Sequence, residues 1–200
     1  KNLVSLKILN MKKNQGHARC NAFGIRYVVK NENFDYLILM DGDGEDRPEE
    51  IRGFIDQSLK NPEYSIVAKR VKRSEGFFFQ ILYQIHKILT IILTGKNINF
   101  GNYTFLKKED VRKISEAPSL WSSFSGTVKK IVKDYKEIES IRGLRYFGPS
   151  KMSFLNLLLH SFSIIAVFKY QVFLRFIILI FIINFLKDFL GIISHLFVMI

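Results

Sequence analysis

The sequence predicts an α/β fold that is followed by apolar helices at the C-terminus. Short apolar runs of strand length, such as 36–40 and 65–68, alternate with longer segments whose apolar residues repeat at helical spacing, such as 17–30. Strands that alternate with helices indicate βαβ units and a mostly parallel sheet. From residue 154 onward the composition changes, and Phe, Ile and Leu dominate. A chain of 200 residues is long enough for one well-buried domain and an appendage.

The predicted elements are separated by residues that end regular structure. Asn14-Gln15-Gly16 forms a turn, Asn61-Pro62 breaks a helix, and Gly95 ends another. Between these points, strands are predicted at 3–9, 36–40, 65–68, 100–106 and 137–141, and helices at 17–30, 48–59, 77–93, 108–114 and 124–132. The helix at 77–93 is unusually apolar, which favours a core or interface helix and leaves contact with a membrane as a second interpretation.

An acidic loop follows the strand at 36–40. Residues 41–46 read Asp-Gly-Asp-Gly-Glu-Asp, and Pro48, Glu49 and Glu50 then favour the start of a helix, which Asp46 is also expected to serve. Carboxylates crowded within a few Å raise one another's pKa, and a divalent cation removes that cost. Hard oxygen ligands suit Mg²⁺ or Mn²⁺. The loop therefore predicts a metal and diphosphate site at the carboxyl edge of the sheet, where α/β folds place ligands.

Other sites also use acidic loops. An EF-hand needs Gly at its sixth position and Glu at its twelfth, where this chain has Asp46 and Arg52. A phosphatase of the haloacid dehalogenase type needs Thr or Val at the position of Glu45, and an acidic pair further along the chain. The EF-hand is therefore excluded and the phosphatase disfavoured. A metal-dependent phosphohydrolase, a catalytically inactive membrane adaptor and a purely structural acidic turn stay open.

The charge of the chain is unevenly distributed. The net charge is +12, but ten of the 18 acids lie between Glu32 and Glu63, so the remainder is strongly basic. A basic protein binds nucleic acid or an anionic membrane, and the apolar C-terminal quarter favours the membrane over nucleic acid. The basic cluster 69–73 and the loop 142–151 have the composition of phosphate-binding segments. The single cysteine, Cys20, excludes an internal disulfide and fits a reducing, cytosol-facing domain.

The C-terminal quarter predicts membrane helices. A bilayer span needs about 20 residues, and the best single candidate is 172–190, with Arg175 and Lys187 near enough to its ends to reach the interface. The segment 189–200 would begin a second span. A buried helical subdomain is the alternative interpretation.

Several stretches, taken in order, resemble glycosyltransferase family 2. They read NQGHARCNAFG, YLILMDGDGEDRPEEI, AKRVKR, GNYTFLKKEDV and RYFGPSKM. The likeness is greatest to the branch with dolichyl-phosphate mannose synthase and the bacterial polyprenyl-phosphate sugar transferases. There the acidic motif runs Asp-x-Asp-x-Gln-Asp-x-Pro-Glu, and this chain has Glu45 in place of Gln. The late motif Arg-x-x-Gly-x-Ser-Lys is matched by Arg145, Gly148, Ser150 and Lys151.

This resemblance implies a GT-A fold, a Rossmann-like mixed sheet, followed by C-terminal membrane helices. It covers roughly residues 3–151 and implies these roles: metal ligands Asp41, Asp43 and Glu45; donor-binding residues Asp41, Asp43, Arg70 and Arg73; acceptor-binding residues Asn102, Arg145, Ser150 and Lys151; and catalytic residues Asp43 and Arg145. Two features depart from the family. The Ser-Gly-Phe-Arg motif that the family usually has near Gly101 is not kept. The family's first strand, with its Pro-x-Tyr-Asn-Glu motif, is absent from the sequence.

The expected function is that of an inverting hexosyltransferase at the cytoplasmic face of the inner or plasma membrane. It would move a sugar from a nucleotide-sugar donor to a polyprenyl phosphate or another cell-envelope acceptor, with Mg²⁺ or Mn²⁺ as cofactor. Its expected partners are these substrates and membrane lipids, and a homo-oligomer stays open. The expected organisation is a transferase domain at 1–151, an amphipathic or juxtamembrane helix at 152–171 and a transmembrane region at 172–200.

Overall fold

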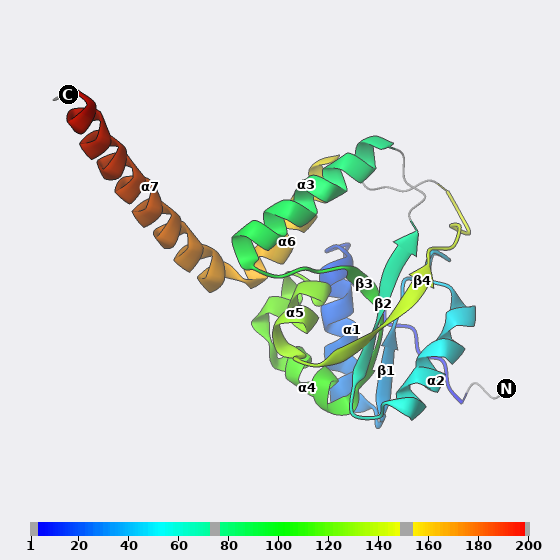
Figure 1. Cartoon of the computed structure of the whole chain (residues 1–200). Coiled ribbons are helices and arrows are strands. Elements are labelled where there is room, and N and C mark those ends of the chain that lie inside the picture. Colours follow the sequence, from blue (N-terminus) through cyan, green and yellow to red (C-terminus); the bar gives the residue numbers. More distant parts are fainter. Residues whose placement is uncertain (1–3, 73–76, 149–153, 199–200) are drawn as a thin grey trace.

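The structure, a computed structural model, describes residues 4–72, 77–148 and 154–198. Figure 1 shows a central sheet with helices on both faces, the helices Phe77–Thr94 and Phe154–Val167 beyond one end of the sheet, and the helix Lys169–Val198, which projects away from the body. The strands are β1 (Tyr36–Leu39), β2 (Ser65–Lys72), β3 (Phe100–Lys107) and β4 (Tyr135–Ile141). The helices are α1 (His17–Asn31), η1 (Pro48–Glu50), α2 (Ile51–Lys60), α3 (Phe77–Thr94), α4 (Lys108–Glu116), η2 (Pro118–Trp121), α5 (Phe124–Ile131), α6 (Phe154–Val167) and α7 (Lys169–Val198).

The sheet is mixed, with the strand order β1-β3-β2-β4. β3 runs antiparallel to β1 and to β2, and only β2 and β4 are parallel. The prediction of a mostly parallel sheet is therefore wrong. The reason lies in α3, which packs with α6 beyond the end of the sheet instead of crossing back along one face (Figure 1). The chain thus re-enters the sheet at the same edge at which β2 ended, so β3 must run in the opposite direction.

Two predicted strands differ from the observed ones. Residues 4–10 form no helix or strand, and the side chains of Val4, Leu6 and Ile8 are exposed. The apolar alternation of this segment has no partner strand among the described residues, and alternation alone cannot supply one. β2 continues beyond Ala68 to Lys72, so the basic cluster 69–73, which was expected to follow the strand, begins inside it.

Hydrophobic residues pack on both faces of the sheet. Ile66 and Phe105 pack with Phe54 of α2 on one face, whereas their neighbours Val67 and Leu106 pack against α1, α4 and α5 on the other. Successive side chains of a strand point to opposite faces, which explains why adjacent residues of β2 and β3 belong to different clusters. Burial of each such side chain contributes about 1.5–3 kcal/mol relative to exposure. The two clusters hold α2 on one face of the sheet and α1, α4 and α5 on the other.

The C-terminal helices form an elbow that the body holds in place. α6 and α7 are bent by 86° at Phe168, whose side chain is buried. Lys130 Nζ of α5 donates a hydrogen bond of 3.0 Å to the carbonyl of Val167, and Arg175 Nη1 of α7 donates one of 2.8 Å to the carbonyl of Ile92 in α3. Both cations bind carbonyls at helix ends, where backbone acceptors lack partners.

α7 is continuous through Lys187 and Asp188, so no helix break separates 172–190 from the predicted start of a second span. No single helix of the described residues is both long and apolar enough to cross a bilayer. The segments Phe154–Val167 and Lys169–Phe189 meet that criterion only as a bent pair. The expected membrane helices are thus weakly suggested.

We predict that Tyr103→Phe lowers the free energy of unfolding by about 1 kcal/mol, because the buried hydroxyl donates a hydrogen bond of 2.6 Å to the carbonyl of Arg47. Burial raises the pKa of Tyr103 to about 12. The stabilising contribution of the neutral hydroxyl is complete below the usual tyrosine pKa of about 10, and it is lost as the pH rises toward the value in the folded chain. Urea unfolding in the alkaline range should therefore show a steeper loss of stability for the wild type. Parallel pH profiles of the two proteins would contradict the prediction.

Candidate functional site

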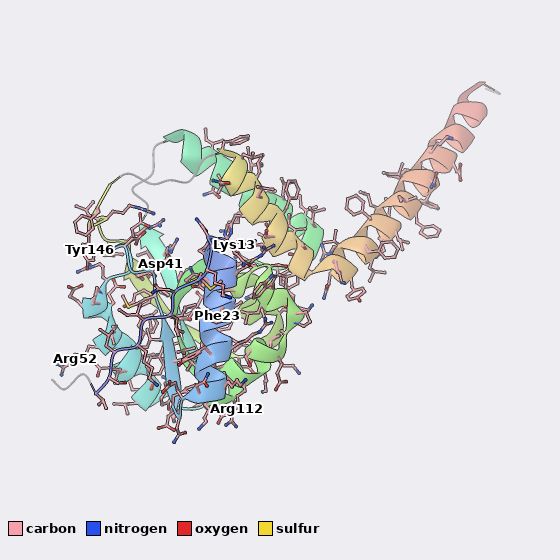
Figure 2. The ribbon with its side chains drawn as sticks, turned by 180° about the vertical axis from the view of Figure 1, so that it is seen from behind. Lys13, Phe23, Asp41, Arg52, Arg112 and Tyr146 are labelled. Carbon is pink, nitrogen blue, oxygen red and sulfur yellow. The ribbon has the colours of Figure 1, made fainter. Side chains whose placement is uncertain are left out.

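Polar side chains from four strands meet at one edge of the sheet. The carboxyl ends of β1, β2 and β4 lie at this edge together with the amino end of the antiparallel β3. The acidic loop (residues 41–46) follows β1, and the arginine loop (residues 142–147) follows β4. Figure 2 shows Asp41 and Tyr146, one from each loop, at this end of the sheet. Although β1 and β4 are the outer strands, their loops are therefore neighbours.

Asp46 shapes the acidic loop from within. Its side chain is 3% exposed, and its Oδ2 accepts a hydrogen bond of 2.8 Å from the backbone N–H of Asp41, which closes the loop on itself. Oδ1 lies 3.8 Å from Nη2 of Arg70. Burial is the main cause that raises the pKa of Asp46. Asp46 thus holds the loop, and it does not serve the helix start as the sequence suggested.

Two backbone hydrogen bonds join the acidic loop to the arginine loop. The N–H of Gly143 donates to the carbonyl of Glu45 at 2.8 Å, and the N–H of Tyr146 donates to the carbonyl of Asp43 at 2.9 Å. Glycine is required for this close approach. A Cβ on Gly143 would lie 2.5 Å from the carbonyl oxygen of Gly44, and a Cβ on Gly44, whose φ is 92°, would lie 2.8 Å from the ring of Tyr146.

Two arginines neutralise the acidic loop. Arg145 Nε lies 3.0 Å from Glu45 Oε1, and Arg145 Nη2 lies 3.1 Å from Asp43 Oδ2. Arg142 binds the other carboxylate oxygen of Glu45. Burial lowers the pKa of Arg142, while the charges of Asp41 and Asp43 act in the opposite direction. Sequence reasoning did not single out Arg142, although its position in a basic, glycine-containing loop next to Arg145 was a usable signal.

Residues at the start of β3 and near the end of β2 contact the acidic loop. Asn102 Nδ2 donates a hydrogen bond of 2.9 Å to Oδ1 of Asp41. The guanidinium of Arg70 lies against the backbone of Gly101, because a Cβ at that position would come within 2.8 Å of Arg70 Nη2. An amide and a guanidinium therefore face the carboxylates of Asp41 and Asp46 from neighbouring strands.

Glu50 connects α2 to the last strand. Its Oε2 accepts a hydrogen bond of 2.7 Å from Ser140 Oγ, and its Oε1 accepts one of 3.1 Å from the N–H of Ile141. The helix start at η1 has no side-chain cap. Glu49 and Glu50 lie in the first turn of η1, as the sequence suggested. The carboxylate of Glu50 also anchors the end of β4, from which the arginine loop departs.

The structure brings most of the predicted site residues together. Asp41, Asp43, Glu45, Arg70, Asn102 and Arg145 all lie at this edge. Arg73, Ser150 and Lys151 lie outside the described residues.

The acidic loop fits a divalent cation only in part. Within the described part of the chain, no three His, Cys, Asp or Glu side chains are grouped to hold a metal ion. Glu45, the expected third ligand, is bound through both carboxylate oxygens by the two arginines. Asp43 is also engaged through both oxygens, because Oδ2 lies 3.1 Å from Arg145 Nη2 and Oδ1 accepts a hydrogen bond of 3.1 Å from the N–H of Glu45. The other two carboxylates of the site are thus Asp41, held by Asn102, and Asp43, shared with Arg145. That set suits Mg²⁺ or Mn²⁺, since such ions commonly bind one or two carboxylates and complete their coordination with water and substrate phosphate.

The family model for glycosyl transferase family 2 matches residues 2–136, which is more than half of the chain. The chain belongs to this family. The comparison with curated proteins finds no match. Membership supports a glycosyltransferase that uses a nucleotide-sugar donor, and the mixed sheet fits a GT-A-like fold. The matched segment of this family 2 chain includes the acidic loop, Arg70 and Asn102, but it ends before the arginine loop.

We predict that Asp46→Asn changes the pH dependence of stability. The folded chain binds the proton of Asp46 more tightly than the unfolded chain, because burial raises the pKa. The stability of the wild type therefore falls as the pH rises from the usual aspartate pKa, about 4, through the higher value in the folded chain. The variant lacks this decline, so its melting temperature should improve relative to the wild type between acidic and neutral pH.

The matched control is Asp56→Asn, which removes an exposed carboxylate from α2. Thermal unfolding of the three proteins across this pH range checks the prediction. A difference between Asp46→Asn and the wild type that stays constant with pH, or that shrinks toward neutral pH, would contradict it.

Proposed function

We propose that this family 2 chain is a membrane-associated, inverting hexosyltransferase that transfers a sugar from a nucleotide-sugar donor to a polyprenyl phosphate or another lipid-linked acceptor. The proposal rests on one observation above all: the acidic loop meets Arg70, Asn102 and Arg145 at a single edge of the sheet. Carboxylates for a cation and arginines for phosphates are the groups that a reaction on a diphosphate donor needs.

Asp41 and Asp43 are the proposed ligands of Mg²⁺ or Mn²⁺ at the donor diphosphate. Bound there, the cation would supply Lewis-acid stabilisation of the leaving diphosphate. Asn102 orients the carboxylate of Asp41 through their hydrogen bond. Arg70, near the end of β2, is the proposed contact for a donor phosphate. Its guanidinium is held by Asp46 and lies against the backbone of Gly101, which supports this role.

Arg145 is the proposed contact for phosphate on the acceptor side of the reaction. Asp43 and Glu45 hold its guanidinium at the edge of the site. In the transfer, the bond between the anomeric carbon and the donor phosphate oxygen breaks, and its electron pair leaves with the diphosphate. A bond from that carbon to an acceptor oxygen forms. A polyprenyl phosphate oxygen is already ionised, so this reaction needs no strong general base, whereas a hydroxyl acceptor would need one.

Membrane association is supported by the exposed apolar surface of α7. Phe173, Phe181 and Phe185 are each at least 66% exposed, and apolar side chains occur around the whole circumference of the helix. Held near a bilayer, the site would meet a lipid acceptor at a high effective concentration. Lys169 and Arg175 at the start of α7 fit the cytoplasmic face of the inner or plasma membrane.

We predict that Asp43→Asn reduces sugar transfer by about 100-fold or more, because it removes a charge from the proposed cation and diphosphate site. The matched control is Glu49→Gln, which removes a carboxylate that is 72% exposed a few residues further along the same segment. The control should retain wild-type transfer. Both variants are assayed in membranes with a panel of nucleotide sugars, Mn²⁺ and polyprenyl phosphate.

The same assay separates the proposed function from its alternatives. Release of inorganic phosphate from a phosphomonoester without any nucleotide sugar would identify a phosphohydrolase. An inactive adaptor would bind no nucleotide sugar in a Mn²⁺-dependent manner, and Asp43→Asn would associate with membranes as the wild type does. Equal transfer by Asp43→Asn and the wild type would show that the acidic loop is not the reaction site.

A further inference from the structure

The end of β4 and the arginine loop bind the segment 43–50 in an ordered series of contacts. From Ser140 to Tyr146, the partners run in the opposite direction, from Glu50 through Glu45 to Asp43. Glu50 binds residues 140 and 141, Glu45 binds residues 142, 143 and 145, and Asp43 binds residues 145 and 146. The series therefore ends at Asp43, which is one of the two proposed ligands of the cation.

The ion pairs become more exposed toward the Asp43 end of this series. The side chains of Arg142 and Glu45 are 19% and 14% exposed, whereas those of Arg145 and Asp43 are 28% and 34% exposed. Separating an ion pair costs less where water can solvate both charges, because a charge that is left buried without a partner is strongly destabilising. The pair of Arg145 and Asp43 is therefore the one that opens most readily.

Arg145 holds the place at Asp43 that a cation would take. Nη2 of Arg145 lies 3.1 Å from Oδ2 of Asp43, and Oδ1 of Asp43 accepts a hydrogen bond of 3.1 Å from the N–H of Glu45. A divalent cation bound by Oδ2 would stand next to the guanidinium, and positive charges a few Å apart repel each other. Oδ2 of Asp43 can therefore hold either the guanidinium or the cation.

Arg142 allows Arg145 to leave without exposing a carboxylate to burial alone. Arg145 bridges two acids, because its Nε lies 3.0 Å from Oε1 of Glu45 while its Nη2 faces Asp43. Arg142 binds the other carboxylate oxygen of Glu45, and the N–H of Gly143 binds the carbonyl of Glu45. When Arg145 turns away, the partly buried Glu45 keeps a counter-ion and the loop keeps a backbone contact. Without Arg142, Glu45 would hold Arg145 more firmly.

We propose that Arg145 is the resident counter-ion of Asp43, that the cation displaces it, and that Arg142 is a positioning residue that holds Glu45 and the arginine loop during this exchange. The inference rests on the proposed function, which places Mg²⁺ or Mn²⁺ at Asp41 and Asp43. The displaced guanidinium is then available to phosphate, because its donors no longer bind carboxylates. Cation binding and phosphate binding to Arg145 are thereby coupled.

The first test measures the reactivity of individual arginines in the full wild-type chain. p-Hydroxyphenylglyoxal modifies accessible guanidinium groups, and mass spectrometry of peptides gives a rate for each residue. Mg²⁺ should raise the rate at Arg145 several-fold and leave the rate at Arg142 unchanged. Arg47, whose side chain is 41% exposed, is the internal control that reacts equally with and without Mg²⁺. In Asp43→Asn, Arg145 should react rapidly without Mg²⁺, and Mg²⁺ should not change its rate.

The second test measures the affinity of the full chain for Mn²⁺ alone, from the electron paramagnetic resonance signal of the free ion. Arg145→Gln removes the competing guanidinium, so Mn²⁺ should bind about fivefold more tightly than to the wild type. The matched control is Arg47→Gln, which removes the same charge from a side chain that pairs with Glu49 and Glu50. It should change the affinity by less than about twofold, because screening weakens the effect of an exposed charge.

The third test isolates the role of Arg142. In Arg142→Gln, Arg145 is the remaining arginine at Glu45, so Mg²⁺ should raise the reactivity of Arg145 less than it does in the wild type. The double variant Glu45→Gln/Arg142→Gln removes the charge that holds Arg145 there, and the response to Mg²⁺ should return. A response of Arg142→Gln equal to that of the wild type would overturn the positioning role. So would a rise at Arg142 as large as that at Arg145 in the wild type, because the whole loop would then detach.

The outcomes separate this inference from the proposed function. If Mn²⁺ binds but Mg²⁺ leaves the reactivity of Arg145 unchanged, the exchange is overturned while the cation site stands. Equal Mn²⁺ affinities of Arg145→Gln and Arg47→Gln would also overturn the exchange, because charge alone would then explain the effect. If neither the wild type nor Arg145→Gln binds Mn²⁺, the cation of the proposed function itself fails. The labelling of the wild type decides the exchange even if a variant does not fold.

Discussion

The candidate site depends on the contact between the acidic loop and the arginine loop. Four acids within six residues would repel one another if they faced water or one another alone. Here Asp46 turns inward to bind the backbone of Asp41, while Arg145 and Arg142 share the remaining negative charge. Backbone hydrogen bonds between the loops hold the charges in register. The loops that follow the two outer strands, β1 and β4, are thereby joined across the ends of β2 and β3, which lie between them.

That contact also explains why the individual acids of the loop have different partners. Asp46 and Glu45 are engaged in holding the loops. Asp41 accepts a hydrogen bond from Asn102, and Asp43 is bound by Arg145 and by the N–H of Glu45. Under the proposed function, one short motif would combine residues that hold the loops with residues that bind a cation. Because β3 runs antiparallel to its neighbours β1 and β2, its amino end places Asn102 at the edge at which the other strands end.

The positions of the helices α1 to α5 and of the last four predicted strands could be read from the sequence, because apolar periodicity and turn residues are local signals. The direction of β3 could not, since it depends on where α3 packs, and packing between distant segments leaves no local signature. The strand expected at residues 3–9 had the right alternation but no partner among the described residues. Likewise the acidic motif indicated a site. The partner of Glu45 could not be read from that motif, because Arg142 lies almost 100 residues further along the chain.

Contacts with the body hold the bend between α6 and α7. Lys130 and Arg175 bind the carbonyls of Val167 and Ile92, and the buried ring of Phe168 removes the freedom that a loop would have at this point. A helix in a bilayer whose thickness does not match its apolar length responds by tilting. If α7 lies in a bilayer, as proposed, such a tilt would rotate the whole body relative to the headgroups. Lipid chain length would then set the orientation of the site toward its acceptor, without any ligand binding to the protein.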